Sequence, residues 1–144
     1  TVFQDYCHSC APINVCQAFD YALTGFQGIQ QIFIPVRKME ISPCDIPDGI
    51  RKSTVHIPYG VKVIGAETFA SHQEIQEVII PDSVTEIKER AFAWCENLSR
   101  IILPKNLTTI GESAFIGCDA LAEIEIPDSV KFIGEEAFYN CLDL

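Results

Sequence analysis

Cysteine and histidine are the residue types in this 144-residue chain whose spacing suggests chemistry. Cys7 and Cys10 form a Cys-x-x-Cys pair with His8 between them, and two further thiols follow at Cys16 and Cys44. Thiolates and imidazoles at such spacing bind zinc, but structural zinc sites usually combine two such pairs. Here the second pair is missing, and no strand–helix–strand pattern surrounds the first. A zinc or redox site in residues 1–57 is therefore the weaker alternative to an N-terminal cap held by a disulfide.

The sequence gives even less support for nucleophilic or acid–base catalysis than for a zinc site. Cys7 with His8 or His56 would make a dyad, yet adjacent residues rarely face each other and no third group orients the base. The acidic side chains of the second half recur at a constant interval, as Glu89, Glu112 and Glu135 do. Such recurrence is more typical of solvent-facing ladders than of a catalytic pair. We expect neither enzymatic activity nor a cofactor.

Composition excludes several classes of protein. Asp and Glu number 20 against 10 Lys and Arg, a formal net charge of −10. A nucleic-acid binder needs cationic side chains against phosphates, so that class is disfavoured. Hydrophobic residues make up 48% and charged residues 21%, which is typical of a globular domain. No apolar run approaches the roughly 18 residues of a membrane-spanning helix.

Proline placement reveals an internal repeat. Six of the eight prolines share one phase of a 23-residue period: Pro12, Pro35, Pro58, Pro81, Pro104 and Pro127. Pro43 and Pro47 fall outside that phase, in the least regular segment. A period between 20 and 50 residues indicates stacked repeats.

Residues at equal positions in successive repeats form columns of one chemical type. The main columns are Val61, Val84, Leu107 and Val130; Ile64, Ile87, Ile110 and Ile133; Phe69, Phe92, Phe115 and Phe138; and Cys95, Cys118 and Cys141, with His72 in the matching place. A repeat as short as this one cannot bury its own apolar face, so these columns predict coils stacked into a solenoid. The three column cysteines are expected to be buried free thiols.

The local pattern predicts the elements of each repeat. Residues 100–103 alternate before the proline as a half-buried strand does, and residues 84–87 form a second, shorter alternation. Pro-Asp-Ser at 81–83 supplies turn residues between the two. Segments such as 112–115 favour a single helical turn, since no repeat has the ten or so residues of a full helix.

The sequence resembles the BspA-like class of leucine-rich repeat. The resemblance rests on Ile-Pro-Asp-Ser-Val, then Ile, Gly, Ala-Phe, Cys and Leu, and is strong over 58–144 and weak over 17–57. Lys88 stands in place of the usual glycine and His72 in place of the usual cysteine. The resemblance implies a right-handed, mostly β solenoid with a parallel concave sheet, short second strands and single helical or 3-10 turns. It also implies protein partners, no catalytic residues, and a surface or secreted bacterial protein, although a cytoplasmic location stays open.

We therefore expect one continuous leucine-rich repeat solenoid. Its parts are a cap at 1–16, degenerate repeats at 17–57 and regular repeats at 58–144. The favoured function is a protein-binding or adhesion module, and the alternative is a structural spacer within a larger repeat protein.

The candidate binding residues lie on the strand before each proline, where alternate side chains face outward. They form two ladders: Gln31, Thr54, Glu77, Arg100 and Glu123; and Phe33, His56, Ile79, Ile102 and Glu125. The second is apolar at Phe33, Ile79 and Ile102, and contiguous exposed apolar area often marks an interface. Such residues also simply favour strands, so both explanations stay open.

The final repeat has no closing strand. The chain stops at Leu144, in the column of Leu98 and Leu121, which leaves the apolar core of the last coil without a cap. We expect either that the chain is a fragment of a longer repeat protein, which is preferred, or that another chain covers this end by self-association. Trp94, at a loop position held by Gly117 in the next repeat, is a minor contact candidate.

Overall fold

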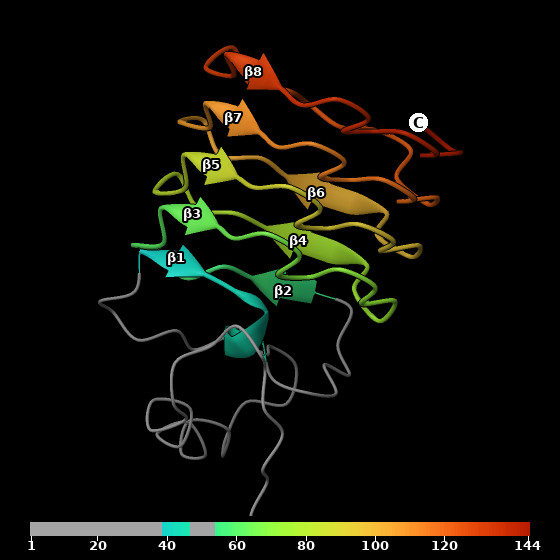
Figure 1. Ribbon diagram of the computed structural model, residues 1–144, viewed down its shortest axis with the longest axis horizontal. Coiled ribbons are helices and arrows are strands. Elements are labelled where there is room, and N and C mark those ends of the chain that lie inside the picture. The colour runs from blue at the N-terminus through green and yellow to red at the C-terminus, as the bar shows by residue number, and fades with distance from the viewer. Residues whose placement is uncertain (1–38, 47–53) are drawn as a thin grey trace, which may run out of the picture.

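The computed structural model describes residues 39–46 and 54–144, which wind into a stack of coils with a parallel sheet along each of two sides (Figure 1). The larger sheet contains β1 (Glu40–Ile41), β3 (Val63–Ile64), β5 (Glu86–Ile87), β7 (Thr109–Ile110) and β8 (Phe132–Ile133). The smaller sheet contains β2 (Thr54–His56), β4 (Glu77–Ile79) and β6 (Arg100–Ile102). A 3-10 turn, η2 (Pro43–Asp45), follows β1.

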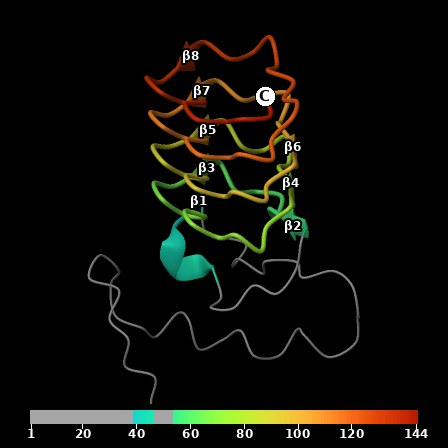
Figure 2. The same cartoon turned by 90° about the vertical axis from the view of Figure 1, so that its right-hand side faces the viewer.

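The sequence period equals one turn of the solenoid. Every paired strand lies parallel to its neighbour, and the partners Glu77 of β4 and Arg100 of β6 are 23 residues apart. Ile79 and Ile102 pair in the same register. Side views of the stack show the two sheets running up opposite sides (Figure 2). The predicted mostly β solenoid of stacked parallel strands is thereby confirmed.

The expected cap at 1–16 and most of the segment 17–57, including Gln31 and Phe33, lie outside the described residues.

The core lies between the two sheets and the turns that join them. The isoleucine column is fully buried at Ile64, Ile87 and Ile110. The phenylalanine column forms a stack in which the centroids of Phe92 and Phe115 lie 5.3 Å apart with ring planes only 1° from parallel. Each coil thus covers the apolar face of the coil before it, as a repeat too short to fold alone requires.

The predicted helical turn takes the form of two consecutive turns. Ala93 N–H bonds the Arg90 carbonyl, and Cys95 N–H bonds the Phe92 carbonyl, at 3.1 and 3.4 Å. Arg90 and Trp94 have positive φ angles of 52° and 59°, a conformation that costs a non-glycine residue about 1 kcal/mol or more. Their N–H groups donate to carbonyls of the next coil, at 2.9 and 2.7 Å, and these bonds offset that cost.

A column of glycines lets successive coils approach closely beside the larger sheet. A Cβ atom at Gly111 would stand 2.5 Å from the Glu89 nitrogen, and one at Gly134 would stand 2.3 Å from the Glu112 nitrogen. These positions exclude a side chain unless the backbone shifts. From the coil of β3 onward, Lys88 is the exception in this column.

The last coil is less covered than the others. Ile133 is 46% exposed, whereas Ile110 one coil earlier is fully buried. The segment 123–126 forms no strand with β6, so the smaller sheet of the described residues ends at β6. The apolar side chains of the last described coil are therefore less buried than those of the coils before it. In the part of the chain that the structure describes, no helix is long and apolar enough to cross a membrane.

Candidate functional site

The smaller sheet presents three of the predicted binding residues in one row, which we call the outward stripe: His56, Ile79 and Ile102. Ile102 is 41% exposed, and the other two are half-buried. The residues between the ladders point inward, and Val78 is fully buried. Because successive side chains of a strand point to opposite faces, the buried row requires the outward one.

A polar row runs beside the outward stripe on the same strands. The Glu77 carboxylate accepts a hydrogen bond from Arg100 Nη1 at 2.7 Å and one from Thr54 Oγ1 at 3.3 Å. It thus links the three strands of the sheet. The Arg100 side chain is 67% exposed, so this pair contributes about 0–1 kcal/mol to stability and serves mainly to fix the charges in place.

In the last coil, the positions that continue both rows are occupied by acidic side chains. Glu123 and Glu125 follow Arg100 and Ile102 by one period and are exposed. Between and after them, Ile124 and Ile126 pack against the core. No cation of the described residues forms an ion pair with either carboxylate. The outward face therefore ends in two unpaired negative charges.

The metal candidates are only partly within the described residues. Cys7, Cys10 and Cys16 lie outside them, and Cys44 is disulfide-bonded. A metal ligand is a thiolate, so a cysteine in a disulfide does not serve as one. Among residues 39–46 and 54–144, no group of three or more metal-ligating side chains comes together.

The column cysteines are free thiols, as predicted. Cys95 Sγ donates to the Phe69 carbonyl at 3.0 Å, and the Cys118 and Cys141 thiols bond carbonyls one coil back in the same way. Burial raises the pKa of the Cys95 thiol to about 12 and also raises the pKa of the Cys118 thiol. These cysteines remain protonated at neutral pH, which makes them structural side chains and poor nucleophiles.

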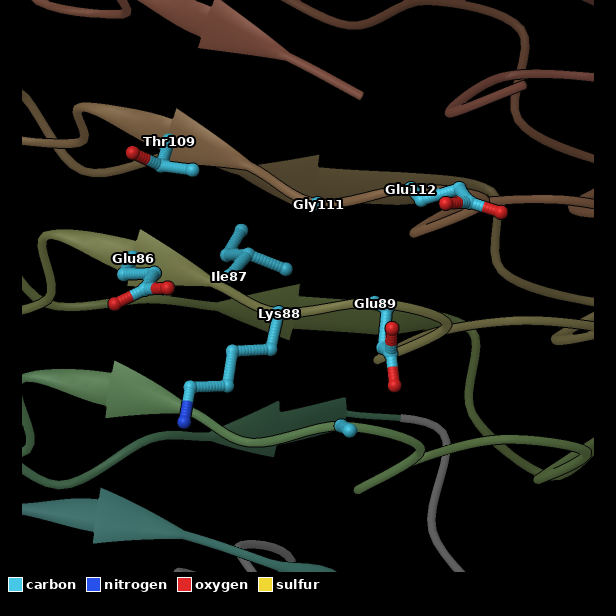
Figure 3. A pocket seen from close by; sticks show the side chains of 8 residues that line it. Glu86, Ile87, Lys88, Glu89, Thr109, Gly111 and Glu112 are labelled. Carbon is cyan, nitrogen blue, oxygen red and sulfur yellow. The ribbon is translucent and has the colours of Figure 1, made fainter. Parts of the chain in front are cut away.

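A shallow groove beside the larger sheet is a second candidate that the sequence did not indicate. It is lined by Glu86, Lys88, Glu89 and Glu112, among others, and passes over Gly111 (Figure 3). Lys88 extends away from Gly111 toward the N-terminal coils, where its Nζ bonds Glu40 Oε1 at 2.9 Å. That hydrogen bond raises the pKa of Lys88. The groove is open and contains no buried polar group aimed into it, so its carboxylates alone make no binding site.

Comparison with known proteins places the chain among repeat proteins. The model of the BspA type leucine rich repeat region matches residues 50–144 with six copies. No curated protein sequence matches the chain.

Two solved structures share the fold. A leucine-rich cell surface protein from Faecalibacterium prausnitzii A2-165 is 35% identical, with a TM-score of 0.64 over 65% of this chain and 25% of that one. The leucine-rich repeat protein of T. pallidum is 29% identical, with a TM-score of 0.58 over 65% of this chain and 57% of that one. The similar region is thus only part of each of these longer proteins.

Proposed function

Since the chain belongs to the BspA-type leucine-rich repeat family, we propose that it is a non-catalytic module that binds protein partners through the outward face of β2, β4 and β6. We further propose that it acts at a cell surface or in secreted form. The description of the similar F. prausnitzii structure as a cell surface protein supports this location.

The register of Ile79 and Ile102 carries the proposal. These two residues are directly paired neighbours on adjacent strands, and they place apolar side chains side by side on the outer face of a sheet. Taking an exposed aliphatic side chain to full burial contributes about 1.5–3 kcal/mol. Ile79 is half-buried and Ile102 is 41% exposed, so a partner that covers both gains the part of this energy that their remaining exposed surface represents. A spacer would gain only the roughly 0.2–1 kcal/mol of sheet stability that a cross-strand apolar pair contributes.

Selection of random peptides displayed on phage tests this surface without a known partner. We expect peptides that bind the wild-type module to lose binding to the variant Ile79→Lys with Ile102→Lys. The matched control, Val63→Lys with Thr109→Lys, adds the same two charges to the outer face of the larger sheet, where both residues are half-buried. It should retain binding, and both variants should unfold within about 1 kcal/mol of the wild type.

The result also separates the binding module from the spacer. If no peptide is enriched, or if enriched peptides bind the Ile79→Lys, Ile102→Lys variant as well as the wild type, the outward stripe is not the binding surface. A loss of several kcal/mol in stability would instead mean that the two side chains belong to the core.

Self-association through the exposed apolar side chains of the last described coil is a second candidate. The exposure of Ile133, in a column that is otherwise buried, favours it. Sedimentation velocity should then show a concentration-dependent dimer that Ile133→Glu abolishes and Glu135→Gln does not. A monomer at all concentrations would exclude this candidate.

A further inference from the structure

The charges on the outward face indicate what kind of segment it accepts. This inference rests on the proposed function of that face. Arg100 is the only arginine or lysine of the described strands β2, β4 and β6, and Glu77 already binds it. Elsewhere, Lys88 bonds Glu40 and Arg90 approaches Glu67 to 3.7 Å, both away from this sheet. Lys62, Lys105 and Lys131 form no ion pair with either carboxylate, so Glu123 and Glu125 have no cationic partner among the described residues.

We propose that the partner is an extended, cationic protein segment that crosses β4 and β6 toward the last coil. Its apolar side chains cover Ile79 and Ile102, and its lysine or arginine side chains bind Glu123 and Glu125.

The spacing of the coils sets the pattern of such a segment. Neighbouring strands lie about 4.8 Å apart, and an extended chain advances about 3.3 Å per residue. From Ile79 to Glu125 is two coils, or about three residues of extended chain. When an apolar side chain of the segment covers the isoleucines, a lysine or arginine two to four positions further along the segment therefore reaches Glu125. His56 lies at the other end of the outward stripe. A cationic side chain of the segment is therefore needed only at the end of the stripe near Glu123 and Glu125.

Desolvation explains why the cation is needed. A segment that covers Ile102 also removes water from the carboxylates next to it, and an unpaired carboxylate loses hydration that only a countercharge restores. An acidic or uncharged segment would leave Glu123 and Glu125 uncompensated. The net charge of −10 acts in the same direction, because it attracts cationic partners and repels anionic ones over longer distances.

The peptides selected on the wild-type module provide the test. We expect them to carry Lys or Arg two to four positions from an apolar residue. We also expect Glu123→Gln with Glu125→Gln to weaken their binding about tenfold or more. The matched control, Glu135→Gln with Glu136→Gln, removes the same two charges from exposed positions in the last coil. It should weaken binding at most about twofold.

Each outcome distinguishes this inference from the proposed function. Peptides that lose binding to Ile79→Lys with Ile102→Lys, but lack cations or ignore Glu123→Gln with Glu125→Gln, would overturn the cationic partner and leave the binding face intact. Equal weakening by both glutamine pairs would assign the effect to net charge and overturn the local site. Peptides insensitive to the lysine variant, or a selection that enriches none, would overturn both.

Discussion

The indole of Trp94 lies over the Cα atom of Gly117 in the next coil. A Cβ atom at Gly117 would stand 2.2 Å from Trp94 Cε3, and the φ angle of Gly117 is +69°. Glycine at this position therefore satisfies two separate requirements, a left-handed backbone and space for an aromatic ring. Trp94 is 46% exposed, so its ring can move away if that space is filled.

Gly117→Ala should destabilise the solenoid by about 1–3 kcal/mol. The left-handed backbone costs alanine about 1–2 kcal/mol, and displacing the indole removes its packing on the next coil. Urea unfolding of the variant measures the loss. In a Trp94→Ala background the same substitution should cost only the backbone part, and an equal cost in both backgrounds would show that the ring places no constraint on residue 117.

The stacked phenylalanines should be unequal in their contribution to stability. Phe92→Ala removes a fully buried ring between two others and leaves a cavity, which should cost about 3–5 kcal/mol. Phe138 stacks on Phe115 alone and is only half-buried, so Phe138→Ala should cost roughly half as much. Similar losses of unfolding free energy for the two variants would contradict the observed gradient in burial.

Features within one strand or between adjacent coils can be predicted from the sequence, whereas contacts across two coils cannot. Because a strand has a period of two, the polar Arg100 places Ile102 on the outward face with it and Ile101 on the inward face. The sequence period predicts that Glu77 lies beside Arg100. The bond between Lys88 and Glu40 spans 48 residues, or about two coils, and a repeat pattern relates only adjacent ones.

The sequence also does not indicate which residues adopt a left-handed backbone. Arg90 and Trp94 adopt positive φ although neither residue favours it, because hydrogen bonds to the next coil hold them there. Glycine is the usual signal for such a backbone, and among the described residues of these two columns it occurs only at Gly117. Tertiary hydrogen bonds override local preference here, and no local pattern reports them.

The glycine column predicts a contrast between two neighbouring repeats. Gly111→Ala should cost about 1–3 kcal/mol, because its Cβ would stand 2.5 Å from the backbone of residues 88 and 89. Lys88→Ala should change stability by less than about 1 kcal/mol, since it only removes an exposed ion pair with Glu40. Thermal unfolding of Gly111→Ala and Lys88→Ala measures the two changes in stability. If Gly111→Ala is as stable as the wild type, the coils can separate at this position.

The free thiols should differ in reactivity along the column. Cys95 and Cys118 are fully buried and Cys141 is only half-buried. A thiol reagent at pH 8, followed by peptide mapping, should label Cys141 first and the other two only at the rate of unfolding. Rapid labelling of Cys95 in the native protein would mean that the coils open locally more often than their burial implies.

The buried thiol of Cys95 should make stability depend on alkaline pH. Burial raises its pKa to about 12 in the native state, against 9.0 without burial. Above pH 9 the unfolded chain loses this proton while the native chain keeps it, so the stabilisation is complete below pH 9 and declines up to about pH 12. At about pH 10.5 the loss should be on the order of 1–2 kcal/mol.

Urea unfolding of wild type and Cys95→Ala at pH 8 and pH 10.5 isolates the effect, because the other titratable groups are the same in both proteins. Cys141→Ala is the matched control, and its smaller burial predicts a smaller difference; equal slopes for wild type and Cys95→Ala would show that the native thiol ionises freely.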